Sequence, residues 1–255
     1  MSGGVEQRRA ILVTGASRGI GAAIARAFAA AGDRVAVHYR RSAAAAEEVA
    51  ASLTGEGHVV VRADIADPEA VRRMVDTAAA KLGGLSVLVN NAGVFLPHPI
   101  AETSYEDWQR AWQLTVNVNL LGAANASWCA AQHMIRGGGG SIVNISSRGA
   151  FRGEPRQPAY GASKAGLIAL GQSLARALGP HGISVTSLAP ALVDTDMAAE
   201  NLAGGGGAQR RAESPLGRLA TAQEVAAAVV FLASAEATMT SGTVLDINGA
   251  SYLRM

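Results

Sequence analysis

The chain has 255 residues and a mass of 25.9 kDa, a length that suits one large α/β domain or two small ones. Hydrophobic residues make up 49% and charged residues 16%, which excludes intrinsic disorder, and the formal charge of +2 is spread along the chain, which does not favour nucleic-acid binding. One cysteine, Cys129, excludes an internal disulfide, and we expect neither a signal peptide nor a membrane span, hence a soluble cytoplasmic protein.

Seven short runs rich in β-branched residues alternate with alanine-rich stretches of helical length. Parallel strands need a crossover, usually a helix, so this alternation predicts an α/β fold: a doubly wound parallel sheet of about seven strands with helices on both faces. The expected strands are residues 10–15, 34–39, 58–64, 85–93, 140–147, 183–190 and 242–249. No Pro- or Ser-rich linker divides the sequence, so we expect residues 1–255 to form a single domain.

A glycine-rich turn, TGASRGIG, follows the first expected strand and opens a helix. Glycines let the backbone approach a pyrophosphate closely, and the free N–H groups at a helix start attract its charge. The spacing differs from G-x-G-x-x-G, so the turn alone leaves open a phosphate cradle or a plain βα turn. The candidate cofactor contacts here are Gly15, Ser17, Arg18, Gly19, Ile20 and Gly21.

The second expected strand ends without the carboxylate that holds the ribose 2′-hydroxyl of NAD. The candidate contacts after His38 are Tyr39, Arg40, Arg41 and Ser42. Arginine pairs well with a 2′-phosphate, so we expect NADP(H) to be preferred over NAD(H), with Arg18 as a second cation. The alternative is that these arginines are ordinary solvated surface residues.

Two further strand ends place candidate residues at the same edge of the sheet. Asp64 could bond an adenine amino group, and small residues after the fourth strand would let a nucleotide lie against the backbone. Each segment could equally be a simple turn. The candidate contacts are Asp64, Ile65, Asn91, Ala92 and Gly93.

The sharpest local motif is Tyr160-Gly-Ala-Ser-Lys164, which follows Ser147 in the run SIVNISSRG. A tyrosine and a lysine four residues apart share one helix face. A neighbouring ammonium favours the phenolate and brings the phenol pKa toward a range useful for acid–base catalysis. Only two lysines occur, Lys81 and Lys164, although an ordinary pair on a helix surface remains the alternative.

Together TGASRGIG, NNAG, N-L-x-G, a serine thirteen residues before a tyrosine and Y-x-x-x-K resemble the motifs of the classical short-chain dehydrogenase/reductase family over almost the whole chain. The resemblance implies a Rossmann-type domain that binds a nicotinamide cofactor, needs no metal, and forms a homo-oligomer, a tetramer or dimer, through the central helices and the last strand. The residues implied as catalytic are Asn119, Ser147, Tyr160 and Lys164. The further cofactor contacts implied are Pro190, Ala191, Val193 and Thr195, with Ala191 in place of the family's glycine.

By this resemblance Tyr160 protonates a carbonyl oxygen as NADPH delivers hydride, and Ser147 bonds the same oxygen. Lys164 lowers the tyrosine pKa and holds the nicotinamide ribose, so Tyr160 and Lys164 are also implied cofactor contacts. Asn119 positions a water in a proton relay. The expected function is therefore an NADP(H)-dependent carbonyl reductase, or the reverse alcohol dehydrogenase. A non-catalytic NADP-binding regulator or scaffold of the same fold is the alternative.

The substrate partner is expected to be a small carbonyl or alcohol. Arg148 and Arg152 could attract an acidic or acyl-carrier-linked group, as in a 3-oxoacyl reductase, or be solvated at the rim of the site. Residues 204–207, all glycine, lie in a polar stretch that is either a mobile lid or a plain surface loop. Other candidate lining residues are Phe95, Phe151, Leu192 and Met197, and no catalytic task is assigned to His38, His58, His98, His133 or His181.

Overall fold

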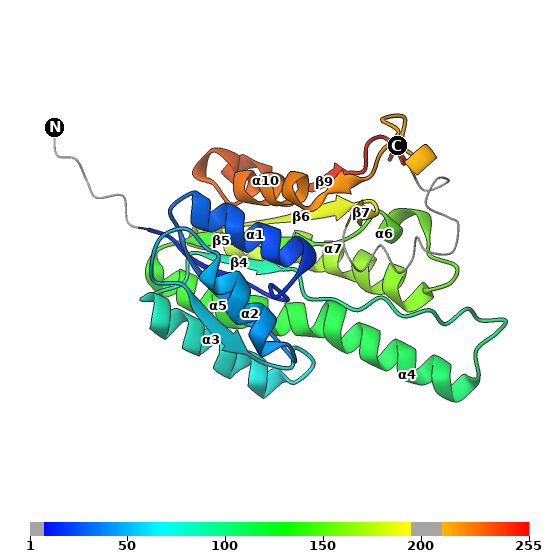
Figure 1. The fold of residues 1–255 in the computed structure, drawn as a ribbon, viewed down its shortest axis with the longest axis horizontal. Coiled ribbons are helices and arrows are strands. Elements are labelled where there is room, and N and C mark those ends of the chain that lie inside the picture. Colours follow the sequence, from blue (N-terminus) through cyan, green and yellow to red (C-terminus); the bar gives the residue numbers. More distant parts are fainter. Residues whose placement is uncertain (1–7, 195–210, 255) are drawn as a thin grey trace.

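The predicted parallel sheet forms the centre of the computed structural model, which describes residues 8–194 and 211–254. Its seven strands run in the order β3-β2-β1-β4-β5-β6-β9, and each neighbouring pair is parallel (Figure 1). The strands are β1 (Ala10–Val13), β2 (Arg34–Tyr39), β3 (Val59–Arg62), β4 (Val87–Asn90), β5 (Gly140–Ile145), β6 (Ile183–Pro190) and β9 (Val244–Ile247). The predicted fold class is confirmed.

Helices cover both faces of this sheet, as Figure 1 shows. The side chains of α1, α2 and α10 pack on one face and those of α3, α5 and α7 on the other. Alternate residues of β1 serve the two layers, with Ile11 and Val13 on the first and Leu12 on the second. The helices are α1 (Gly19–Ala30), α2 (Ala43–Ala51), α3 (Pro68–Leu82), α4 (Tyr105–Val116), α5 (Gly122–Gly137), α6 (Gly149–Arg152), α7 (Pro158–Leu178) and α10 (Ala222–Leu232).

A π-helical turn, η1 (Asn117–Leu121), joins α4 to α5. The glycine that follows it explains part of the N-L-x-G motif. A Cβ atom on Gly122 would lie 2.5 Å from the carbonyl oxygen of Ile65, so only glycine lets this helix approach the segment after β3 so closely. The close approach draws Asn119 toward the carboxyl edge of the sheet.

Some elements differ from the sequence-based expectation. A two-stranded parallel pair, β7 (Val193–Asp194) with β8 (Ala220–Thr221), was not predicted, because two-residue strands carry no periodic signal. The connection between α5 and β5 is short, since α5 runs to Gly137 and β5 begins at Gly140. The glycines at 204–207 lie outside the described residues. Across residues 8–194 and 211–254, no helix has both the length and the apolar character needed to cross a membrane.

Candidate active site

The candidate site lies at the carboxyl edge of the sheet, where the order of the parallel strands reverses between β1 and β4. Thr14 joins the segments that follow these two strands. Its hydroxyl donates to the carbonyl of Val89 (3.1 Å) and accepts from the backbone N–H groups of Asn91 (2.9 Å) and Ala92 (3.0 Å). The amide of Asn91 donates in return to the carbonyls of Thr14 (2.8 Å) and Gly15 (3.1 Å). The glycine-rich turn and the NNAG segment therefore form one unit.

The glycine-rich turn leaves the shallow backbone surface that a pyrophosphate requires. Gly15 has a positive φ of 65°, and a Cβ atom there would lie 2.9 Å from the Cα of Ala92. A Cβ on Gly21 would overlap the Gly15 carbonyl oxygen. Helix α1 begins after Arg18, whose side chain makes no capping hydrogen bond. The N-terminal turn of α1 thus fits the phosphates of a dinucleotide.

His38 holds the glycine-rich turn to the neighbouring strands, a role that the sequence analysis missed. The imidazole is buried, its Nδ1 accepts from Gly15 N–H (2.9 Å), and its Nε2 donates to the Ala63 carbonyl (3.2 Å). The His38 carbonyl accepts from Ala16 N–H (2.8 Å). Burial disfavours the charged ring and lowers the His38 pKa from 6.5 to about 4.

The residues expected to hold the adenosine half of the cofactor lie around this unit. Arg40 forms an ion pair with Asp64 at 3.6 Å, and the two side chains are 36% and 48% exposed. A pair this exposed is weak, so its arginine can exchange the carboxylate for a phosphate. Arg18, Arg41 and Ser42 are exposed, Ile65 and Val193 are buried, Ser17, Gly19, Ile20, Tyr39 and Ala191 are partly buried, and Thr195 lies outside the described residues.

Lys164 is buried on α7, so the Tyr160–Lys164 pair is not an ordinary surface pair. Its ammonium donates to the carbonyl of Ile145 (2.7 Å) at the end of β5. The hydroxyl of Ser146 donates to the backbone carbonyl of Lys164 (2.8 Å), which fixes α7 against the same strand. Burial lowers the Lys164 pKa from 10.5 to about 8.

Tyr160 faces Ser147 from the first turn of α7. Burial raises the pKa of the Tyr160 phenol, a hydrogen bond with Ser147 opposes that rise, and the charge of Glu154 adds to it. The Lys164 nitrogen lies 5.7 Å from the centre of the Tyr160 ring, and Phe95 packs edge-on against that ring at 4.7 Å. The pKa of Tyr160 is therefore raised in this structure, with burial as the largest cause, and the expected lowering by Lys164 stays a prediction.

Asn119 lies in η1 and closes the site from the other side. Its side-chain oxygen accepts from Val94 N–H (2.8 Å), and its amide donates to the Val94 carbonyl (3.0 Å) and to Ser163 on α7 (3.2 Å). A Cβ atom on Gly93 would lie 3.4 Å from the Asn119 oxygen and 3.6 Å from the Lys164 nitrogen. The structure thus brings Asn119, Lys164, Tyr160 and Ser147 together.

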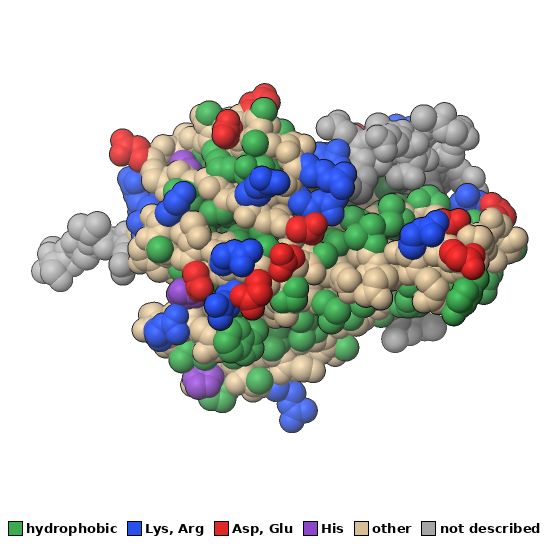
Figure 2. Space-filling model, turned by 90° about the horizontal axis from the view of Figure 1, so that it is seen from below, with side chains coloured by type: hydrophobic (Ala, Val, Ile, Leu, Met, Phe, Trp, Pro, Cys, Tyr) green, Lys and Arg blue, Asp and Glu red, His purple; other side chains and the backbone are tan. Residues whose placement is uncertain are grey.

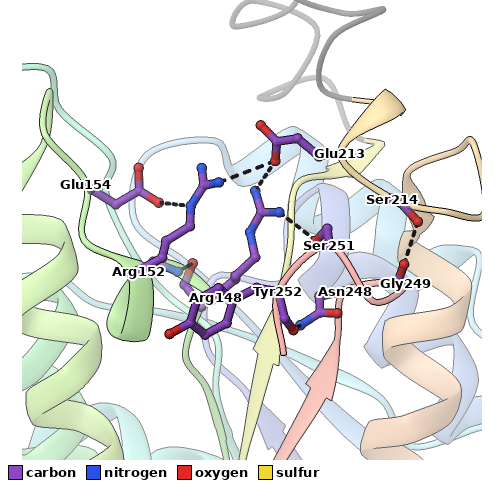
Figure 3. Close-up of polar contacts among 11 residues, drawn as sticks. Arg148, Arg152, Glu154, Glu213, Ser214, Asn248, Gly249, Ser251 and Tyr252 are labelled. Carbon is purple, nitrogen blue, oxygen red and sulfur yellow. Dashed lines mark hydrogen bonds and ion pairs between the residues drawn. The ribbon is translucent and has the colours of Figure 1, made fainter. Parts of the chain in front are cut away.

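The two arginines that were expected to attract an acidic group are already paired (Figure 3). Arg148 is 4% exposed, and its guanidinium donates to Glu213 (2.7 Å) and to the hydroxyl of Ser251 (2.6 Å). Arg152 donates to the same Glu213 oxygen (3.4 Å) and lies 3.7 Å from Glu154. Neither arginine is simply solvated, because both hold the C-terminal segments against the turn after Ser147.

A cavity of about 250 Å³ opens beside this cluster. Its lining includes Arg148, Leu192 and Glu213, together with residues 246–249 at the end of β9. Phe95 contacts Tyr160 as described, whereas Met197 lies outside the described residues. The cavity therefore presents the Glu213 carboxylate and the Arg148 guanidinium that is paired with it.

A family model described as "Enoyl-(Acyl carrier protein) reductase" matches residues 15–250. The chain belongs to the classical short-chain dehydrogenase/reductase family. It is 41% identical to a short-chain type dehydrogenase/reductase of Picea abies, over 94% of this chain and 91% of that protein. It is 38% identical to D-threitol dehydrogenase of Mycolicibacterium smegmatis (95% and 92% covered) and 35% identical to a 3-oxoacyl-[acyl-carrier-protein] reductase of Staphylococcus aureus (98% and 100% covered).

Family membership indicates the cofactor class and the chemical groups on which the site acts. Members of the short-chain dehydrogenase/reductase family use nicotinamide cofactors, and these relatives are oxidoreductases of alcohol and carbonyl groups. The protein is therefore an oxidoreductase of CH–OH or C=O groups. The glycine-rich turn and the Thr14–Asn91 unit fit the cofactor that this chemistry requires.

The buried His38 predicts a loss of stability in acid. Its pKa is about 4 in the folded chain and 6.5 in the unfolded chain, so the unfolded state binds the extra proton between these values. The contribution of neutral His38 is complete above pH 6.5, and the free energy of unfolding falls by about 2 kcal/mol between pH 7.5 and pH 5.

Urea unfolding of the wild type and His38→Asn at both pH values checks this. Asparagine retains a donor and an acceptor but does not titrate, so the wild type loses more stability than the variant on acidification. Parallel pH dependence in the two proteins would contradict the assignment.

Proposed function

We propose that this protein is an NADPH-dependent carbonyl reductase, or the reverse alcohol dehydrogenase, with Tyr160 as the general acid and base. The observation that carries the proposal is the buried Lys164 ammonium, 5.7 Å from the centre of the Tyr160 ring, with Ser147 close enough to the phenol to lower its pKa. A phenol with a raised pKa keeps its proton at neutral pH, which is the form that a general acid needs.

In the reduction, the Tyr160 hydroxyl donates its proton to the substrate oxygen, and the Ser147 hydroxyl bonds the same oxygen. When bound, the reduced nicotinamide supplies the hydride. Lys164 is charged below its pKa of about 8 and favours the phenolate that Tyr160 becomes. Asn119 holds Gly93 and Val94 beside Lys164 through its side chain, as a positioning residue; the family resemblance adds a relay water there.

The cofactor selectivity that we propose is NADP(H) over NAD(H). Arg40 follows directly on β2 and is paired with the exposed Asp64, and Arg41 and Arg18 are exposed. The described end of β2 carries no carboxylate that would repel a 2′-phosphate. A guanidinium and a phosphate form charge-assisted, often bidentate hydrogen bonds, so Arg40 gains by exchanging Asp64 for that group.

We propose an uncharged carbonyl or alcohol as the substrate. Glu213 already bonds Arg148 and Arg152, so a substrate carboxylate beside Ser147 would have to displace Glu213 from the buried Arg148. A threitol dehydrogenase and a 3-oxoacyl reductase among the relatives show the span of candidate substrates, from polyols to 3-oxo acyl groups. The paired arginines favour the uncharged members of that span.

We also propose that the protein is a homo-oligomer. Four exposed apolar side chains recur every seven residues from α4 through η1 to the end of α5: Leu114, Leu121, Trp128 and Ile135, which are 39%, 49%, 63% and 37% exposed. Such a stripe on a helix surface is typical of an interface. Figure 2 views the molecule from below, and hydrophobic side chains are spread along that face between the charged ones.

Replacing Tyr160 by phenylalanine removes only the proton donor, so we expect kcat to fall by roughly 10³-fold. Turnover is measured as NADPH oxidation with the carbonyl probes ethyl acetoacetate and cyclohexanone, and as NADP⁺ reduction with the alcohol probe threitol. Stabilisation by NADPH, about 2.7 kcal/mol at 100 times its Kd, is expected to remain. Tyr105→Phe, at an exposed position on α4, is the matched control.

Near-normal turnover in Tyr160→Phe would contradict the mechanism. A wild-type protein that NADPH stabilises but that turns over none of these probes would favour the regulator or scaffold alternative.

Replacing Arg40 and Arg41 by alanine is expected to weaken NADPH binding roughly 10-fold or more, because charged hydrogen bonds to a phosphate are lost. NADH binding is expected to change by less than about twofold, since it carries no 2′-phosphate. Fluorescence titration with both cofactors measures this. Arg72→Ala on α3, 62% exposed, is the control, and equal weakening of both cofactors would remove the 2′-phosphate argument.

Replacing Leu121 and Trp128 by lysine introduces charge into the proposed interface. We expect the wild type to have the mass of a dimer or tetramer in size-exclusion chromatography with light scattering, and the double variant to have a smaller mass. Ile100→Lys, 76% exposed but outside the stripe, should keep the wild-type mass. An unchanged mass in the double variant would exclude this stripe as the interface.

A further inference from the structure

His98 is a buried histidine whose ring lies against the start of the helix that carries Tyr160 and Lys164. It belongs to the segment between β4 and α4 and is 1% exposed. Its Nδ1 lies 2.7 Å from the Leu96 carbonyl oxygen and its Nε2 lies 3.2 Å from the backbone nitrogen of Ala159. A carbonyl can only accept, so Nδ1 carries the proton and Nε2 accepts from Ala159 N–H.

This hydrogen bond completes the N-terminal turn of α7. The first N–H groups of a helix have no partner within the helix and need a cap. Gln157, at the capping position, makes no side-chain hydrogen bond to that turn, and Pro158 has no N–H. The N–H groups of Tyr160 (3.0 Å) and Gly161 (3.3 Å) both reach the Gln157 carbonyl. The Ala159 N–H is the donor that remains, and His98 accepts it from 61 residues away in sequence.

The same segment contacts the helix at two further points. The His98 N–H donates to the carbonyl of Arg156 (2.8 Å), just before α7. Phe95 packs edge-on against the Tyr160 ring, with 4.7 Å between ring centres. Trp108 packs edge-on against the His98 ring at 5.4 Å and fixes its orientation. The residue beside Ala159 is Tyr160, so a shift of this turn moves the phenol relative to Ser147.

We propose that His98 is a positioning residue for Tyr160: by capping the first turn of α7 it sets the distance between the Tyr160 hydroxyl and Ser147. The kinetic part of this inference rests on the proposed reductase function. It assigns His98 no contact with substrate or cofactor. A small displacement of a reacting group is enough to lower a rate strongly, which gives a cap at this place a catalytic consequence.

The chain provides a matched control in His58. Its Nδ1 also accepts a backbone N–H, that of Val35, at 3.2 Å across 23 residues. Val35 lies near the beginning of β2, at the opposite edge of the sheet from the site. Loss of the His58 bond therefore removes the same kind of interaction without touching α7.

The experiment compares the wild type with His98→Phe, His98→Asn, His98→Gln and His58→Phe. Phenylalanine keeps the ring packing against Trp108 but has no acceptor, and asparagine is too short to reach Ala159. Glutamine can place its oxygen where Nε2 lies and should restore the cap. Should His98→Phe fail to fold, His98→Asn carries the test.

Two quantities are measured on the full chain. Hydrogen–deuterium exchange followed by mass spectrometry gives the rate of amide exchange in the peptide that covers residues 157–162. It is measured without substrate or cofactor. Steady-state kinetics with NADPH and ethyl acetoacetate reports kcat and the KM for NADPH. We expect His98→Phe and His98→Asn to exchange faster at residues 157–162 and to lose roughly 10- to 100-fold in kcat, with the KM for NADPH within about threefold of the wild type.

His98→Gln should return the exchange rate at residues 157–162 and kcat most of the way to the wild-type values. His58→Phe should change neither the exchange rate nor kcat. Unaltered exchange at residues 157–162 in His98→Phe or His98→Asn would overturn the cap, whatever the activity. Faster exchange with unchanged kcat would overturn the positioning role. A wild type that reduces no carbonyl probe overturns the proposed function and the kinetic part of the inference, which distinguishes that failure from a failure of the cap.

Discussion

The site depends on how backbone groups are satisfied where parallel strands end. Within the sheet each N–H and C=O bonds its neighbour, but beyond the last paired residue these groups need other partners, and buried groups left unpaired are costly. Here polar side chains supply the partners: Thr14 and Asn91 lie beyond β1 and β4, and Lys164 bonds the end of β5. The ring of His38, within β2, bonds Gly15 beyond β1 and Ala63 beyond β3. Because the strands are parallel, all these ends meet at one edge, and the side chains that replace the ladder also form the walls of the site. Fold and site are consequences of one hydrogen-bonding requirement.

The sequence predicts most of this fold because its signals are local. Short β-branched runs separated by alanine-rich helices specify the seven strands, and the positions where the strands stop specify the edge at which candidate residues gather. The Tyr160–Lys164 spacing is likewise local, since one helical turn brings the two side chains to one face. The spacing does not show that Lys164 is buried against β5. It also does not show that burial is the largest cause of the shift in the Tyr160 pKa.

The remaining features escape prediction because their partners are far apart in the chain. His38 bonds the Ala63 carbonyl across 25 residues, and Arg148 reaches Glu213 across 65 and Ser251 across 103. No periodicity or motif encodes a side chain that accepts one particular backbone N–H, so a histidine without metal spacing carries no signal of that role. Arg148 shows the effect on function: its position after Ser147 suggests a free cation for an acidic substrate, but folding places Glu213 on it. Whether an arginine is free to bind a ligand depends on its partner in the folded chain, and the sequence alone does not identify that partner.

Burial has a directional consequence for the proposed chemistry. It favours the neutral form of every ionisable group, so it raises the pKa of Tyr160 and lowers that of Lys164 to about 8. At neutral pH Tyr160 keeps its proton while Lys164 remains mostly charged, which is the combination that carbonyl reduction requires. Oxidation of an alcohol instead needs the Tyr160 phenolate, whose formation burial opposes and the hydrogen bond from Ser147 assists. Raising the pH toward phenolate formation also discharges Lys164, which removes the cation that would stabilise it. In the proposed mechanism the two shifts therefore oppose the charged pair from which oxidation would start, because burial disfavours both the phenolate and the ammonium.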